Sequence, residues 1–117
     1  MAAKRYHIIV DVTGSSNEIL NDEVGLKNFL VSLTTKIDMK VLYGPVVVSG
    51  IPENPGLSGF VIIDFSHISI HTFTKSNEAL VDIFSCKPYD LEKAKEAVLG
   101  YFKVLSEQAR IQQVFWG

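Results

Sequence analysis

The stretch FVIIDFSHISIHTFTKSNEALVDIF, residues Phe60–Phe84, contains three short runs of strand-forming residues in close succession. The runs Phe60–Ile63, Ile68–Phe73 and Ala79–Phe84 are rich in β-branched and aromatic side chains, which fit the half-buried surface of a sheet. Strands that follow one another through short connections usually pair as neighbours. The stretch therefore predicts the centre of a mainly antiparallel sheet.

Further strands are expected on both sides of this stretch, at Tyr6–Val12, Val41–Val48 and Ile111–Trp116. The first run places its side chains alternately on two faces, as a half-buried strand does. Gly44-Pro45 should bend or bulge the second run, because proline lacks the amide hydrogen that a sheet uses. Ile51–Gly56 is the richest turn signal in the chain and predicts a loop.

Two amphipathic helices complete the expected pattern. Asn21 or Asp22 is a suitable cap for the first helix and Asp90 for the second, because such side chains accept hydrogen bonds from the free amides of a first turn. The apolar positions of the two helices are Leu26, Phe29, Leu30, Leu33 and Ile37, and Leu91, Ala94, Val98, Tyr101, Phe102 and Leu105. Each set makes one helix face apolar. The order of elements predicts an α+β fold, a two-layer α/β sandwich with both helices on one face of the sheet.

The opposite face of the sheet also needs a cover, because the central strands are apolar on both sides. A second copy of the protein could supply that cover, so a homodimer or a higher homo-oligomer is expected. The 117 residues suffice for a single domain, residues 1–117, with one core.

Composition excludes several classes of function. The chain is 47% hydrophobic with a net charge of -2, and its 11 basic residues are spread among 13 acidic ones. Because no basic stripe or RNA-binding aromatic motif appears, nucleic acid is not an expected partner. No apolar run is long enough for a membrane span, or for a signal peptide before Asp11. The single cysteine cannot form an internal disulfide, so the expected location is the reducing cytoplasm.

Three side chains suggest chemistry: His67, His71 and Cys86. A metal site is not expected, because residues four apart in a strand are separated by about 13 Å, whereas zinc holds its ligands at about 2.3 Å. A Cys–His nucleophile pair usually comes with a glycine-rich elbow or a protease signature, and neither surrounds Cys86. Each of the three residues taken alone is more often structural than catalytic.

Taken together, three segments resemble the pyruvoyl-dependent S-adenosylmethionine decarboxylases in their short prokaryotic form. The segments are Leu57–Ile63 (LSGFVII), Ser66–Thr72 (SHISIHT) and Val81–Cys86 (VDIFSC), and the similarity runs from about His7 to the second helix. The resemblance implies the family's α/β sandwich and a homodimer whose sites use both subunits. It also implies a decarboxylase of polyamine synthesis that is made as a proenzyme.

The resemblance assigns the self-processing roles. Ser66 matches the serine at which family members cut their own chain: its hydroxyl attacks the carbonyl of Phe65, and the ester is then eliminated and hydrolysed to a pyruvoyl group and ammonia. His71 matches the histidine that serves the elimination, and Ser58 matches the serine that assists processing. The implied products are a β chain of residues 1–65 and an α chain of residues 66–117.

The pyruvoyl group is the implied cofactor, with no pyridoxal phosphate and no metal. In the family it forms a Schiff base with the substrate's α-amino group and accepts the electrons released as carbon dioxide leaves. Cys86 matches the residue that then protonates carbon, and a thiol suits that role because its pKa lies near working pH. Strict strand alternation would place Ser66 and His71 on opposite faces, so a backbone irregularity is expected at Phe65–His67.

The chain departs from the family pattern at three places. Phe65 stands where members usually have Glu, and Phe73-Thr74-Lys75 stands where they have Trp-Pro-Glu. The adenine-stacking aromatic residue is expected at Pro52 or beside it, and neither Ile51 nor Pro52 has an aromatic ring. Lysine cannot accept the hydrogen bonds of the ribose hydroxyls as glutamate does. These departures favour a smaller amino-acid-type substrate, L-arginine or L-ornithine, with S-adenosylmethionine itself, and hence spermidine synthesis, as the alternative.

A cationic substrate side chain would need a carboxylate in the pocket. The candidates for substrate contact are Glu53, Asp64, Lys75, Glu78 and Asp82. Lys75 would repel a cation if it pointed inward, and exposed acids are usually only solvated. An alternative of another class is an unprocessed, catalytically silent regulatory partner, because the loss of Glu before Ser66 would hinder cleavage.

Overall fold

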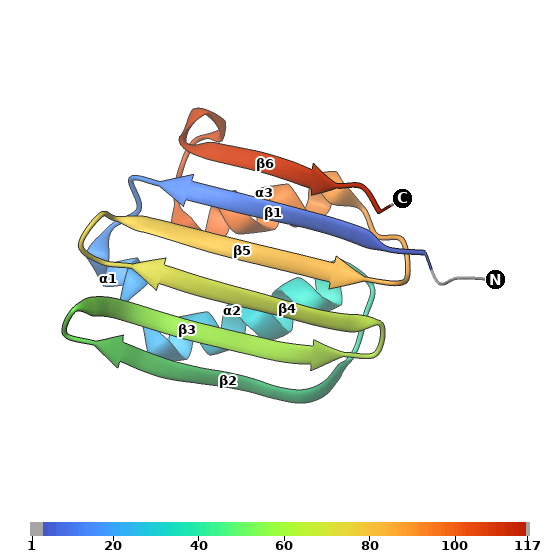
Figure 1. The fold of residues 1–117 in the computed structure, drawn as a ribbon, viewed down its shortest axis with the longest axis horizontal. Coiled ribbons are helices and arrows are strands. Elements are labelled where there is room, and N and C mark those ends of the chain that lie inside the picture. Colours follow the sequence, from blue (N-terminus) through green and yellow to red (C-terminus); the bar gives the residue numbers. More distant parts are fainter. Residues whose placement is uncertain (1–3, 117) are drawn as a thin grey trace.

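A six-stranded antiparallel sheet forms one layer of the protein, and helices cover one of its faces (Figure 1). The computed structural model describes residues 4–116. The strands are β1 (Tyr6–Thr13), β2 (Val41–Ile51), β3 (Asn54–Ile63), β4 (Ser66–Phe73), β5 (Glu78–Ser85) and β6 (Ala109–Val114). Their order across the sheet is β2-β3-β4-β5-β1-β6. The predicted two-layer α+β sandwich is therefore confirmed.

The two long helices begin at the predicted caps. Helix α2 (Glu23–Lys36) follows Asp22, whose carboxylate accepts a hydrogen bond from the Gly25 amide at 2.9 Å. Helix α3 (Leu91–Phe102) follows Asp90, which accepts from the Lys93 amide at 3.1 Å. A short helix α1 (Asn17–Leu20) and a 3-10 turn η1 (Ser106–Gln108) were not predicted, since each is too short to carry a periodic pattern.

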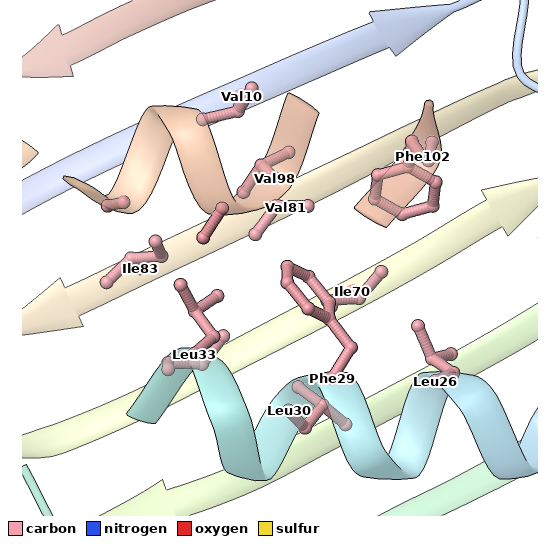
Figure 2. Close-up of a cluster of buried hydrophobic side chains, with 14 of the residues drawn as sticks. Val10, Leu26, Phe29, Leu30, Leu33, Ile70, Val81, Ile83, Val98 and Phe102 are labelled. Carbon is pink, nitrogen blue, oxygen red and sulfur yellow. The ribbon is translucent and has the colours of Figure 1, made fainter. Parts of the chain in front are cut away.

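The core lies between the helices and the sheet. Figure 2 shows Leu26, Phe29, Leu30 and Leu33 of α2 and Val98 and Phe102 of α3 facing Val10, Ile70, Val81 and Ile83 of the strands. One predicted core position is wrong: Leu105 is 66% exposed. Helix α3 ends at Phe102 because Lys103 adopts a left-handed conformation, which turns the chain away before Leu105.

Strand β3 is longer than predicted, because the expected loop Ile51–Gly56 contracts to a tight turn at Pro52-Glu53. Gly56 makes the extension possible: a Cβ at this position would lie 2.0 Å from the Thr72 carbonyl oxygen, so only glycine fits against β4. The Thr72 hydroxyl also accepts a hydrogen bond from the Leu57 amide at 2.8 Å. The expected irregularity of β2 is confirmed, since its register with β3 shifts between Tyr43 and Val46, around Gly44-Pro45.

The face of the sheet away from α2 and α3 is called the open face. Alternate residues of each strand lie on it, among them His7, Ser58, Phe60, His71 and Asp82. Phe60 and Ile62 are 38% and 39% exposed there, so apolar surface remains uncovered in a single chain. Within residues 4–116 there is no helix of the length and apolarity that a membrane span requires.

Candidate functional site

Ser66 is the first residue of β4 and directly follows the two-residue turn Asp64-Phe65. Its φ is 141°, a backbone conformation that normally only glycine adopts. Such a residue is strained by about 1–3 kcal/mol and persists only where its surroundings hold it. The backbone irregularity expected at Phe65–His67 is therefore present, and it lies at Ser66 itself, directly after the peptide that joins it to Phe65.

Cys86 lies beside this peptide. Ser66 pairs with Ser85 across the β4–β5 ladder, so Cys86, the residue that follows β5, comes alongside the turn. The Cys86 amide donates a 2.9 Å hydrogen bond to the Phe65 carbonyl oxygen, and the Cys86 side chain is exposed. The carbonyl that Ser66 would attack is thus held and polarised by a fixed donor, the arrangement that stabilises an oxyanion.

The segment after β5 is firmly anchored. The buried Ser85 hydroxyl accepts a hydrogen bond from the Lys87 amide at 2.9 Å and donates one to the Lys87 carbonyl at 2.8 Å. The Tyr89 hydroxyl donates to the Ile83 carbonyl at 2.9 Å. Burial raises the pKa of Tyr89 well above its ordinary value, so this hydroxyl stays a donor over the whole working pH range. These bonds fix the Cys86 amide against Phe65.

Ser58 and His71 form a second cluster, on the open face. They are cross-strand partners in β3 and β4, and Ser58 Oγ lies 2.8 Å from His71 Nδ1. A cavity of about 230 Å³ adjoins them, lined also by Val46, Val48, Gly59, Phe60 and Ser69. A hydrogen-bonded histidine beside a small cavity is suited to moving a proton to or from a bound group.

The two clusters lie apart within one chain. Ser66 and His71 are both in β4, five residues apart, which corresponds to about 16 Å along a strand. Ser66 opposes Ile63 of β3, whereas His71 opposes Ser58. The structure thus brings Ser66 to Cys86 and Ser58 to His71, but it does not join the two pairs in a single chain.

The candidate substrate contacts are scattered over the sheet. Only Asp64 lies at the Ser66 end, where its carboxylate accepts a hydrogen bond from the Lys40 amide at 3.0 Å. Asp82 lies in the middle of the open face and pairs with His7 at 2.7 Å. Glu78 opposes Phe73 at the far end of β4. The Lys75 ammonium reaches the Glu53 carbonyl at 3.4 Å, between the two turns at that end.

Sequence reasoning missed two residues of these surroundings, His7 and Lys87. The contact between His7 and Asp82 is diagonal, since Asp82 directly opposes Ile9 of β1. This contact can be predicted only when the register of β1 and β5 is known, because the two residues are 75 positions apart in the sequence. Lys87 follows Cys86 without any motif, and its contacts with Phe65 and Asp38 depend on the tertiary fold. Among residues 4–116, no three His, Cys, Asp or Glu side chains gather to hold a metal ion.

Comparison with known proteins gives a consistent family match. The family model described as S-adenosylmethionine decarboxylase matches residues 6–114. The chain is 34% identical over 87 residues to the S-adenosylmethionine decarboxylase proenzyme of Thermodesulfovibrio yellowstonii, which is 74% of this chain and 62% of that protein. It is 28% identical over 88 residues to the arginine decarboxylase proenzyme of Caldivirga maquilingensis, covering 72% of this chain and 66% of that protein.

A solved structure has the same fold. The crystal structure of the adenosylmethionine decarboxylase from Aquifex aeolicus superimposes with a TM-score of 0.78 at 22% sequence identity. The match covers 100% of this chain and 93% of that one. The T. yellowstonii match spans only 62% of that protein, which is less than two thirds of its length.

Proposed function

The chain belongs to the S-adenosylmethionine decarboxylase family, in its short prokaryotic, pyruvoyl-dependent form, and from this premise we propose that it is a self-processing decarboxylase of polyamine synthesis. It cuts itself between Phe65 and Ser66 and then removes the α-carboxylate of an amino-acid-type substrate. One observation carries the proposal: a strained serine directly follows a carbonyl that the Cys86 amide holds at 2.9 Å.

Self-cleavage begins with an acyl shift. The Ser66 hydroxyl attacks the Phe65 carbonyl carbon, the Cys86 amide stabilises the negative charge on the oxygen, and the peptide C–N bond breaks to leave an ester on Ser66 Oγ. Relief of the strain at Ser66 favours this step. Removal of the Ser66 α-proton expels the Phe65 carboxylate, and water then converts the remaining dehydroalanine to a pyruvoyl group and ammonia. His71 is the base for the α-proton, with Ser58 orienting its imidazole at 2.8 Å.

Ser66 would carry the pyruvoyl group, and its place beside an exposed thiol fits that group. The pyruvoyl group supplies a ketone that binds the substrate amine and takes up the electron pair released with carbon dioxide. Cys86 returns a proton to the substrate carbon. The thiol must be reduced for this, which suits a protein of the cytoplasm.

Replacement of Cys86 by alanine should separate cleavage from turnover. The variant keeps the backbone amide that holds the Phe65 carbonyl, so it is expected to cut itself as the unchanged protein does. It loses the proton donor, so decarboxylation should fall about 10²–10⁴-fold. A denaturing gel measures the first property and carbon dioxide release the second. Full turnover by Cys86→Ala would remove the thiol from the mechanism.

The separation of the two clusters supports a site that a second copy of the chain completes. A proton cannot pass directly over the roughly 16 Å between Ser66 and His71 of one β4 strand. If two open faces pack about a twofold axis near the middle of β4, the Ser66 end of each β4 strand comes next to the His71 end of the other. Such packing would also cover the exposed Phe60 and Ile62. The proposed assembly is a homodimer with two shared sites.

Arginine or ornithine is the proposed substrate. The positions that would hold a nucleoside carry Pro52 and Lys75, while the residues that act on the α-amino acid end remain. Asp82 is already paired with His7, so Asp64, beside Ser66, and Glu78, near His71, are the better partners for a cationic side chain. The similarity to both kinds of decarboxylase proenzyme agrees with either substrate class, and S-adenosylmethionine is the alternative.

Carbon dioxide release from three carboxyl-labelled substrates should decide between them. L-arginine or L-ornithine is expected to react at least tenfold faster, in kcat/KM, than S-adenosylmethionine, because a tenfold preference needs only about 1.4 kcal/mol from one charge pair. Activity confined to S-adenosylmethionine would assign the protein to spermidine synthesis and refute the smaller substrate. No release from any of them, with an uncut chain, would favour the regulatory partner.

A further inference from the structure

Phe65 is held on two sides by the segment that follows β5. Its carbonyl accepts the hydrogen bond of the Cys86 amide at 2.9 Å. Phe65 is 38% exposed, and its ring lies under the side chain of Lys87, the residue that follows Cys86. Lys87 Nζ is 5.2 Å from the ring centroid. An ammonium at this distance from an aromatic face makes a favourable cation–π contact.

Lys87 is not a freely moving surface lysine. Its ammonium donates a 2.9 Å hydrogen bond to the Asp38 carbonyl and lies 3.7 Å from the Asp38 carboxylate. Its backbone is tied at both the amide and the carbonyl to the buried Ser85 hydroxyl. The charge is therefore fixed in place before it meets Phe65, so little further entropy is lost in the contact.

From these contacts we infer that Lys87 is a positioning residue for self-cleavage, which clamps the Phe65 ring and so holds the scissile carbonyl against the Cys86 amide. The inference rests on the proposed function. Ser66 needs such support, because its backbone is strained and would relax if Phe65 could turn freely. Once the chain is cut, the Phe65 carbonyl no longer needs to be held. Replacement of Lys87 should therefore change the rate of self-cleavage but not the rate of decarboxylation.

The test follows cleavage of newly synthesised full-length chain over time on a denaturing gel. Lys87→Met keeps the length of the side chain but removes its charge, and it should cleave about three- to fivefold more slowly. Lys87→Arg keeps a cation over the ring and should cleave at nearly the unchanged rate. Lys36→Met, which removes an exposed charge at the end of α2, is the matched control and should have no effect.

A double-mutant cycle tests the contact itself. Phe65→Leu should slow cleavage about as much as Lys87→Met, and the double variant should be no slower than either single one, because each change removes the same contact. Decarboxylation per processed chain should be unchanged in Lys87→Met. Three results would overturn the clamp while leaving the proposed function intact. Lys87→Met could cleave at the wild-type rate, Lys87→Arg could fail to preserve that rate, or the double variant could cleave more slowly than either single variant. An uncut wild-type chain would overturn both.

Discussion

Ser66→Ala protein is expected to remain one uncut chain and to release no carbon dioxide above background. Alanine has no hydroxyl to attack the Phe65 carbonyl, so neither the ester nor the carbonyl group derived from it can form. No standard side chain offers a ketone or aldehyde that could form a Schiff base with a substrate amine, so the loss of activity should be complete. A denaturing gel and the carbon dioxide assay measure the two properties on one preparation.

A matched serine-to-alanine variant distinguishes the loss of the Ser66 hydroxyl from a loss of folding stability. Ser76 is an exposed serine in the turn between β4 and β5, at the other end of β4 from Ser66. Ser76→Ala should cleave and turn over as the unchanged protein does, and both variants should unfold at a similar temperature. Rapid decarboxylation by uncut Ser66→Ala protein would refute the self-processing mechanism.

His71→Ala chains should not complete self-cleavage alone, but a partner chain that carries His71 should restore it. Alone, the variant lacks the base for the Ser66 α-proton, so the ester should persist and hydroxylamine should split the chain at Ser66. When His71→Ala chains are produced together with Ser66→Ala chains, each mixed dimer would contain one complete site: Ser66 from the first chain and His71 from the second. With equal amounts and random pairing, about half of the His71→Ala chains should be cut.

Different tags on the two chains identify which one is cut. Only the His71→Ala chain should yield fragments, because the other chain has no hydroxyl at position 66. A partner with both substitutions, Ser66→Ala and His71→Ala, is the control and should give no rescue. If co-production leaves His71→Ala chains as unprocessed as they are alone, the shared site is wrong and His71 acts, if at all, within its own chain.

Local signals made part of the fold predictable. The starts of α2 and α3 follow from Asp22 and Asp90, since a capping carboxylate acts on amides within three residues. The length of β3 could not be predicted in the same way. Pro55-Gly56 is a turn signal in isolation, and only pairing with β4 turns it into strand.

The sequence yields the candidate site as a set of residues but not as an arrangement. Resemblance makes Ser66 and Cys86 candidates, and the β4–β5 register explains why they lie side by side. The distance between Ser66 and His71 follows from strand geometry once both are known to lie in one unbroken strand. The contact of Lys87 with Phe65 depends on the conformation of two connections, which no periodic pattern encodes.

The intact mass of the purified, denatured wild-type protein tests the central claim most directly. The account predicts two species: residues 1–65 ending in a free Phe65 carboxylate, and residues 66–117 lighter by one ammonia than a fragment that begins with serine. A single mass for the unbroken 117-residue chain, from a preparation that decarboxylates its substrate at full rate, would contradict it.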